Sequence, residues 1–225
     1  MKKRNILIVA AHPDDEVLGC GGTISRLINE GYEVFTIILG EGITSRNYSS
    51  KLKKKELQEL KNQMYKANKI LGVRKVFNFN LKDNQLDTIP LLEIVKKIEK
   101  IKNEIKPEII FTHYKNDLNI DHKITYDAVI TATRPVIDEP VKTIYSFEIL
   151  SSTEWNYPLS FSPNFFFDIT KTISKKIEAM KIYKSEIRDF PHPRSLEGIK
   201  LNAKMWGLKA GLKFAEAFQL VRCNA

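Results

Sequence analysis

The sequence of 225 residues contains few cysteines and no long apolar run, and both absences exclude classes of protein. Its two cysteines, Cys20 and Cys223, stand near opposite ends of the chain, which argues against a disulfide framework and against a cysteine-rich zinc module. The longest early apolar run, residues 6–11, is too short for a membrane span or for the core of a signal peptide. We therefore expect a cytoplasmic protein with no segment inserted into a membrane.

The chain also lacks internal repeats, low-complexity segments and linkers rich in proline, serine or glycine. A hydrophobic content of 43% and an aromatic content of 10% are typical of globular proteins and exclude a disordered or fibrous chain. We therefore expect one domain over residues 1–225, large enough to bury a core and a pocket without disulfide bonds.

Basic residues outnumber acidic residues by 36 to 27, which gives a net charge of +9. Such an excess fits a nucleic acid, an anionic membrane face or a phosphate-bearing substrate, and it equally fits lysines on a solvated surface. The lysine runs lack the interleaved aromatic residues of a single-strand binding platform. We expect no nucleic-acid partner, and a phosphate-bearing substrate remains open.

Strand and helix patterns alternate along the first 133 residues. Buried strands are predicted over residues 5–11, 32–39, 73–79 and 108–113, and helices over residues 16–30, 51–71, 90–105 and 122–133. This alternation predicts a Rossmann-like α/β fold with a mostly parallel sheet, in which ligands bind beyond the carboxyl ends of the strands. Later patterns predict strands at 142–150 and 164–169 and helices at 171–187 and 195–208, packed on the same core and supplying loops over the pocket.

Histidines and carboxylates follow the first and the fourth predicted strands. His12 and Asp15 lie three residues apart across a strand-to-helix turn, and His122 opens the helix after the fourth strand. Imidazole and carboxylate groups together suit zinc, and ferrous iron or cobalt almost as well, and three protein ligands leave a catalytic zinc one open position. Asp14 diverges from its neighbour and is placed to accept a proton from water, which predicts hydrolysis of an amide or ester.

The same residues are also compatible with structural roles and with nucleotide binding. Acids at a helix start commonly serve as caps, and histidines at strand ends are commonly structural. A nucleotide-binding Rossmann protein would use Gly19, Gly21 and Gly22 as a phosphate loop, but the dinucleotide fingerprint places its first glycine directly at the strand-to-helix turn. Here His-Pro-Asp-Asp-Glu occupies that turn, and close helix packing explains the glycines.

The residues themselves are similar to a known family. Ala-His-Pro-Asp-Asp-Glu at 11–16, Gly-Cys-Gly-Gly at 19–22 and Asn-Ile-Asp-His at 119–122 resemble the LmbE-like or PIG-L family of metal-dependent N-deacetylases. Shorter likenesses cover most of the remaining chain, at residues 40–46, 71–73, 152–155, 191–195 and 215–218. The resemblance implies a Rossmann-like enzyme that removes acetyl from an N-acetylated amino sugar, often N-acetylglucosamine within a nucleotide, lipid or glycan conjugate. It also leaves a homo-oligomer open.

The resemblance also implies roles for single residues. His12, Asp15 and His122 match the metal ligands, and Asp14 matches the general base. Arg46 falls where the family offers an arginine to the substrate, where a guanidinium can hold phosphate or hydroxyl groups, although a solvated loop charge explains it as well.

One departure concerns the second motif, where many relatives carry His and this chain has Asn119. An asparagine can donate a hydrogen bond to an oxyanion but cannot deliver a proton. Either Asp14 returns its proton to the leaving amine, or His192, flanked by two prolines, supplies another, unless residues 191–195 only cap the next helix.

Further residues are assigned around this centre. Asp121, His192 and Arg194 are placed on the substrate side, and Asp121 is also expected to orient a neighbouring imidazole. His113 either lines the pocket or is structural. Glu154 and Trp155 either form a wall for the sugar or pack in the core, and Glu216 is expected to pair with a basic residue.

Overall fold

The computed structural model describes residues 4–43 and 50–224, with the side chains of residues 50–53 excepted. The strands are β1 (Asn5–Ala10), β2 (Glu33–Gly40), β3 (Lys75–Leu81), β4 (Ile109–His113), β5 (Thr143–Phe147), β6 (Phe165–Asp168) and β7 (Ala215–Cys223). The helices are α1 (Asp15–Asn29), α2 (Ser50–Leu71), α3 (Leu91–Ile105), α4 (Ile120–Ala132), α5 (Ile173–Ile182) and α6 (Leu196–Ala210), with short 3₁₀ turns η1 (Leu86–Thr88) and η2 (Thr153–Trp155).

The strands form one seven-stranded sheet in the order β3-β2-β1-β4-β5-β7-β6. The first five strands in this order run parallel, and β7 is antiparallel to both of its neighbours. The predicted α/β class with a mostly parallel sheet is therefore confirmed. Strand β1 pairs with β2 on one side and with β4 on the other, so the direction in which the sheet is built reverses between β1 and β4. Ligand sites of open α/β sheets lie at such a reversal.

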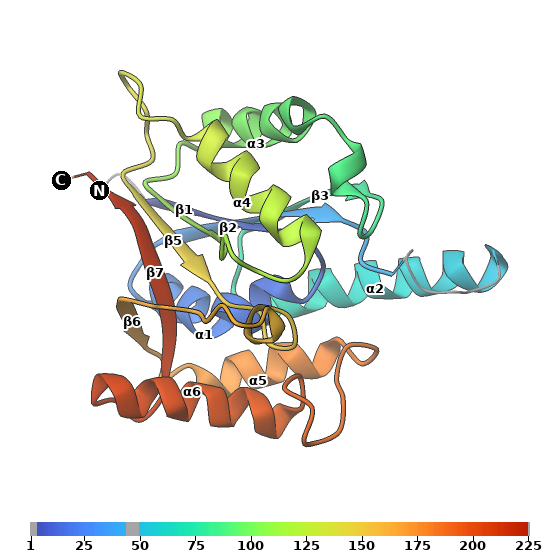
Figure 1. Cartoon of the computed structure of the whole chain (residues 1–225), viewed down its shortest axis with the longest axis vertical. Coiled ribbons are helices and arrows are strands. Elements are labelled where there is room, and N and C mark those ends of the chain that lie inside the picture. The colour runs from blue at the N-terminus through green and yellow to red at the C-terminus, as the bar shows by residue number, and fades with distance from the viewer. Residues whose placement is uncertain (1–3, 44–49, 225) are drawn as a thin grey trace.

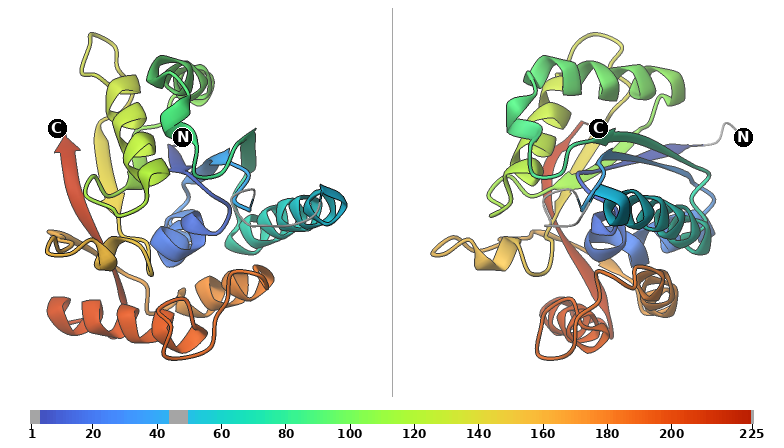
Figure 2. Two further views of the ribbon diagram at one scale, coloured as in Figure 1. Left: turned by 45° about the vertical axis from the view of Figure 1, so that its right-hand side comes forward. Right: turned by 90° about the vertical axis from the view of Figure 1, so that its right-hand side faces the viewer.

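Helices cover both faces of the sheet (Figure 1). Helices α3 and α4 lie on one face and α1, α2, α5 and α6 on the other, a division that the turned views in Figure 2 also show. Alternate residues of β1 face the two layers: Ile6 and Ile8 belong to the core under α1, α2 and α5, whereas Leu7 and Val9 belong to the core under α3 and α4. Burial on both faces explains the continuous apolar run of this strand.

Strand β7 was not among the predicted strands. It inserts between β5 and β6, but its second half is only half-buried, and Glu216, Gln219 and Arg222 interrupt its apolar residues. A strand without a continuous apolar run or clean alternation gives little sequence signal.

Several predicted boundaries were also wrong. Helix α4 begins at Ile120 rather than at His122, so that His122 lies in its first turn. Strand β5 ends at Phe147, before the predicted 150, and α5 ends at Ile182, before the predicted 187. None of the helices in the described ranges combines the length and apolarity needed to cross a bilayer.

Candidate metal and catalytic site

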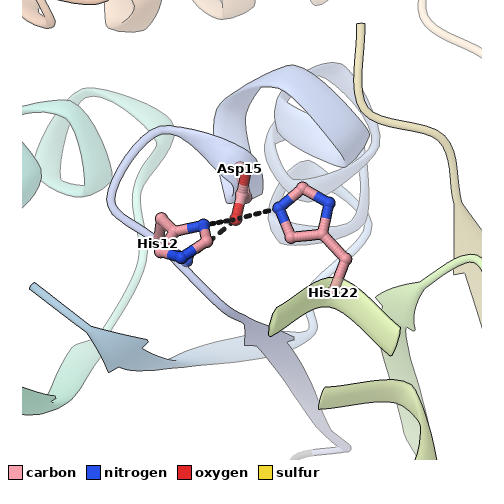
Figure 3. Close-up of side chains that lie close together, drawn as sticks. All are labelled: His12, Asp15 and His122. Atoms are coloured by element: carbon pink, nitrogen blue, oxygen red, sulfur yellow. Dashed lines mark hydrogen bonds and ion pairs between the residues drawn. The ribbon is translucent and has the colours of Figure 1, made fainter. Parts of the chain in front are cut away.

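His122 comes together with His12 and Asp15, two residues of one turn that are distant from it in sequence, where β1 and β4 end (Figure 3). Asp15 Oδ2 lies 3.5 Å from His12 Nδ1 and 3.4 Å from His122 Nε2. One ligand atom from each residue lies within 4.8 Å of the others, and all three residues are buried. Two imidazole nitrogens and one carboxylate oxygen form the donor set of a catalytic zinc site, so the residues fit a divalent metal ion. The structure brings together the three predicted ligands.

The turn after β1 fixes the first two of these residues. The His12 backbone N–H donates to Asp15 Oδ2 at 2.8 Å, which ties the carboxylate to the strand end. Asp14 between them has a φ of 106°, a left-handed conformation that a residue other than glycine adopts rarely. Such conformations cluster at functional sites, where the surrounding structure holds them in place.

Each of the two imidazoles is held by a second carboxylate on its other ring nitrogen. His12 Nε2 lies 2.9 Å from Asp121 Oδ2, and His122 Nδ1 lies 3.0 Å from Asp117 Oδ1. Asp121 also accepts hydrogen bonds from the backbone N–H groups of Asn84 and Leu86, at 2.8 and 3.0 Å. Carboxylates in this position fix the tautomer of a ligand histidine and leave the opposite nitrogen free for a metal. Asp121 is fully buried, in line with the expected orienting role.

Asp117 is tied in turn to the segment after β5. Ser152 Oγ donates to Asp117 Oδ1 at 2.5 Å, and Thr153 Oγ1 donates to Asp117 Oδ2. These contacts, together with the paired His122 imidazole, outweigh the effect of burial and lower the pKa of Asp117 to about 2. Asp117 is therefore a carboxylate at neutral pH and can hold the proton of His122 Nδ1.

The charges of the three converging residues depend on one another. Burial lowers the pKa of His12, but hydrogen bonds with Asp121 and Asp15 outweigh it and raise the pKa to about 10. Burial acts in the same direction on His122, and the nearby Asp15 and Asp117 carboxylates raise its pKa to about 9. Burial raises the pKa of Asp15, yet His122 and His113 bring it well below its usual range. The cluster thus carries protons that a metal ion would have to displace.

His113 is a structural residue at this site. It is fully buried, its Nε2 accepts the backbone N–H of Ala11 at 2.9 Å, and its ring stacks on His122 with centroids 4.0 Å apart. Burial, followed by the nearby His122, lowers its pKa well below the usual range. Of the two roles left open for His113, the structure supports the structural one.

Asp14 lies beside the three ligands and points to another partner. Its carboxylate is buried, and its Oδ2 lies 3.1 Å from Arg194 Nη1, which also lies 3.5 Å from Glu186 Oε2. Burial raises the pKa of Asp14 well above its usual value, with Arg194 acting in the opposite direction. Asp14 occupies the capping position of α1, but its side chain makes no capping hydrogen bond, so helix capping does not account for it.

The Glu16 side chain holds the backbone of Asp14 in place. Its Oε2 accepts the backbone N–H of Asp14 at 3.1 Å, and its Oε1 accepts hydrogen bonds from Asn68 Nδ2 and Tyr183 Oη at 2.8 and 2.6 Å. Burial raises the pKa of Glu16 to about 7. Three elements, α1, α2 and the end of α5, are thereby tied to the turn that carries Asp14.

Both side-chain amide atoms of Asn119 take part in hydrogen bonds. Its Oδ1 accepts the backbone N–H of Asp121 at 2.8 Å and caps α4, while its Nδ2 donates to Asn84 Oδ1 at 3.0 Å. It nevertheless lines the cavity over the site.

The cavity has a volume of about 190 Å³. Its lining is almost entirely polar and is formed by His12, Pro13, Asp14, Asp15, Gly42, Asp83, Asn84, Asn119, His122, Ser151, Ser152, Glu186 and Arg194. Six of the residues assigned from the sequence are therefore on this wall. Asp121 lies behind His12, and His192 lies outside the lining, with its ring against Trp155 at a centroid distance of 5.8 Å. Arg46 falls outside the described residues.

Sequence reasoning gave no role to Asp117, Asn84 or Glu186. Asp117 lies two residues before the motif at 119–122, and an acidic residue shortly after the end of a strand was a usable signal. Asn84 and Glu186 reach the site from the loops after β3 and α5, whose paths no local pattern fixes.

The glycines of α1 serve close packing. A Cβ at Gly19 would lie 2.4 Å from the Phe147 ring, and a Cβ at Gly22 would lie 2.9 Å from Ile169 side-chain atoms. Both positions face buried apolar side chains, so the glycines permit close packing of α1, as expected from the sequence. They do not form a phosphate-binding loop.

The fold and the site define an α/β protein with a candidate metal site at the point where the strand order reverses. Comparison with known families identifies which class of α/β protein this is. The model of the PIG-L family, described as GlcNAc-PI de-N-acetylase, matches residues 7–133, more than half of the chain. The chain belongs to this family.

Curated relatives agree with this membership. An uncharacterized deacetylase of Escherichia coli, YaiS, is 28% identical over 196 residues, 82% of this chain and 92% of the relative. The diacetylchitobiose deacetylase of Thermococcus kodakarensis is 24% identical over 97% of this chain and 83% of its own.

Solved structures share the fold. An N,N′-diacetylchitobiose deacetylase from Pyrococcus horikoshii superposes with a TM-score of 0.79 at 21% identity, covering 98% of this chain and 85% of that one. A zinc-inhibited form of teicoplanin deacetylase Orf2 gives 0.76 at 16% identity, covering 98% and 99%. GalB, a 4-carboxy-2-hydroxymuconate hydratase from Pseudomonas putida, also gives 0.76, at 21% identity, covering 99% and 98%. The fold alone therefore does not choose between deacetylation and hydration.

Proposed function

We propose that this protein is a zinc-dependent N-deacetylase that removes the acetyl group from an N-acetylated amino sugar carried on a nucleotide, lipid or glycan. The observation that carries the proposal is the convergence of His12, Asp15 and His122 within 4.8 Å, with the buried Asp14 carboxylate beside them and outside the ligand set. The deacetylase names of the relatives support the same reaction class.

His12, Asp15 and His122 would hold the metal, and zinc bound there would polarise the acetyl carbonyl and activate water. Asp14 accepts the proton of the attacking water, because its buried carboxylate has a raised pKa and is a stronger base than an exposed one. Arg194 holds that carboxylate in place at 3.1 Å. Asn119 Nδ2 is a donor on the cavity wall that can stabilise the oxyanion once it leaves Asn84.

The leaving amine needs a proton, and Asp14 is the better of the two candidates. Asp14 lines the cavity, whereas His192 lies against Trp155 outside it. Partial burial, Arg194 and Arg188 lower the pKa of His192, so its protonated form is scarce at neutral pH. Replacement of His192 by Ala separates the two: turnover that falls while metal content stays intact would return the acid role to His192.

The metal and the carrier require one combined experiment. The purified protein is stripped with a chelator, reloaded with zinc, ferrous iron or cobalt, and assayed for acetate release from a panel of N-acetyl sugars and their nucleotide-linked forms. We expect release that depends on the metal and that is lost in Asp14→Asn with metal content unchanged. Zinc is titrated from below one equivalent upward, because a zinc-inhibited form is known for the teicoplanin deacetylase.

Two outcomes would overturn the proposal. Acetate release that is equal in metal-free and loaded protein would remove the metal from the reaction. No acetate release from any sugar, together with tight binding of NAD and no bound transition metal, would favour the nucleotide-binding alternative. A cytoplasmic location, a phosphate on the substrate and a homo-oligomer stay predictions.

A further inference from the structure

The cavity over the site holds only part of a conjugated substrate. Its volume of about 190 Å³ is below the roughly 300–1,000 Å³ of pockets that enclose a drug-sized ligand. Its lining contains no aromatic side chain other than the two histidines His12 and His122 among the described residues. A polar cavity of this size suits the reacting amino sugar, so the next unit of a conjugate must lie outside it.

The aromatic side chain of Trp155 stands near this cavity, three residues after the lining residue Ser152. Trp155 is 41% exposed, which excludes core packing as its role. The Trp155 indole meets the His192 ring edge to face, with centroids 5.8 Å apart. Aromatic side chains commonly line the places where proteins hold small ligands, and an exposed indole beside a polar cavity offers such a surface.

Trp155 and His192 are each hydrogen-bonded through their own segment to a residue of the cavity wall. Trp155 ends the turn η2, and its backbone N–H donates to the carbonyl of Ser152, a lining residue whose hydroxyl binds Asp117. His192 Nδ1 accepts the backbone N–H of Arg194 at 3.1 Å, and Arg194 holds Asp14. The contact between Trp155 and His192 therefore joins two segments of the cavity wall. One segment carries Ser152, which binds Asp117 behind His122, and the other carries Arg194, which holds Asp14.

We propose that Trp155, with the His192 ring packed against it, forms a subsite for a further ring of the conjugate that carries the reacting amino sugar. The inference rests on the proposed deacetylase function and deepens it, because it makes the substrate a conjugate of at least two rings. The chemistry is that of a ring with an apolar face stacked on an indole. A second sugar supplies such a ring directly next to the amino sugar, and a nucleobase supplies it beyond a diphosphate and a ribose. Trp155 is a specificity residue and takes no part in the reaction itself.

The test compares substrates with one and two rings. The metal-loaded protein is assayed on N-acetylglucosamine, on N,N′-diacetylchitobiose and on UDP-N-acetylglucosamine. We expect Trp155→Ala to raise KM about tenfold for at least one of the two larger substrates, with kcat within about twofold. KM for N-acetylglucosamine is expected to stay within about twofold, and Trp155→Phe to keep most of the affinity. The larger substrate that responds identifies the second ring.

Tyr65 offers a matched control. It is 44% exposed on α2 and does not line the cavity, so Tyr65→Ala should change none of the constants. An equal rise in KM for N-acetylglucosamine, or no rise for either larger substrate, would overturn the subsite.

Binding without turnover keeps the two proposals separable. The chain has two tryptophans, and the other, Trp206, is buried. Even if no acetate is released from any sugar, a two-ring sugar should change the tryptophan emission of the wild type and not that of Trp155→Phe. An emission change of the same size in both proteins, or in neither at saturating sugar, would sink the subsite independently of the reaction.

Discussion

Arg194 Nη1 lies 3.1 Å from Oδ2 of Asp14 and holds this buried carboxylate beside the three converging ligands. The sequence analysis places Arg194 on the substrate side, and in the structure Arg194 lines the cavity and contacts Asp14, Glu186 and the carbonyl of Leu150. Arg194 is therefore placed to orient the Asp14 carboxylate and to favour its ionised form.

Replacement of Arg194 by Ala should therefore lower kcat by about 100-fold, because a misplaced reacting group loses about that much. The sign of the pH effect follows from the pKa of Asp14, which Arg194 lowers against the effect of burial. Without the guanidinium that pKa rises further, so the acidic limb of the pH–rate profile should move to higher pH. Steady-state kinetics across the acidic and neutral range, with metal content measured in parallel, check both effects.

Arg194→Lys is the conservative control, since it keeps the charge and loses the planar geometry. We expect it to restore the acidic limb more fully than it restores kcat. A loss of bound metal in Arg194→Ala would instead make the residue structural.

The carboxylates behind the two histidines should control metal affinity. Asp121 and Asp117 each face the ring nitrogen opposite to the one that faces Asp15. Asp121→Asn and Asp117→Asn should weaken metal binding by about 10- to 100-fold, whereas His12→Ala and His122→Ala should abolish it at the same metal concentration. Competition with a chromophoric chelator measures the constants, and unchanged affinity in both Asn variants would contradict the support role.

The raised pKa values of the two histidines predict opposite pH trends for stability and for metal binding. Their pKa values of about 10 and about 9 exceed the value of about 6.5 in an unfolded chain, so the folded metal-free protein binds more protons. This contribution to stability is fully present below about pH 6.5 and is lost as the pH rises through about 9 to 10. Metal affinity rises over the same range, by up to about 100-fold per pH unit if two protons are displaced.

Urea denaturation in chelator from about pH 6 to about pH 10, repeated with bound metal, checks this pair of trends. As the pH rises, we expect the two histidines to contribute less to the unfolding free energy of the metal-free protein. The difference in unfolding free energy between the loaded and the metal-free protein should grow. A metal affinity that is independent of pH below about 9 would mean that the histidines are neutral in the folded chain.

The extent to which the site could be predicted follows from chain distance and topology. His12 and Asp15 share one turn, and the end of β1 lies beside the end of β4 in any sheet of this order, so His122 could be expected nearby. The contacts of Arg194 depend on the path of the loop between α5 and α6, which no periodic pattern fixes. The expected basic partner of Glu216 is confirmed as Lys176, but its identity required the position of β7.

Glu216 stabilises the helix that carries Asp15. Helix α1 is non-helical at Cys20, and just beyond it the backbone N–H groups of Gly22 and Thr23 donate to the Glu216 carboxylate at 3.0 and 2.7 Å. The same buried carboxylate binds Lys176 Nζ at 2.5 Å. Glu216 thus caps the second half of α1 from β7.

Replacement of Glu216 by Ala should therefore cost about 3–5 kcal/mol of unfolding free energy, because it leaves the Lys176 charge buried without a carboxylate and two N–H groups unpaired. The urea midpoint of the metal-loaded protein measures the loss. The double replacement Glu216→Gln with Lys176→Met removes the buried charge while keeping an acceptor for the helix, and it should recover more than half of the loss. If the unfolding free energy of Glu216→Ala lies within about 1 kcal/mol of the wild-type value, water replaces the carboxylate, and the cap has no part in holding Asp15.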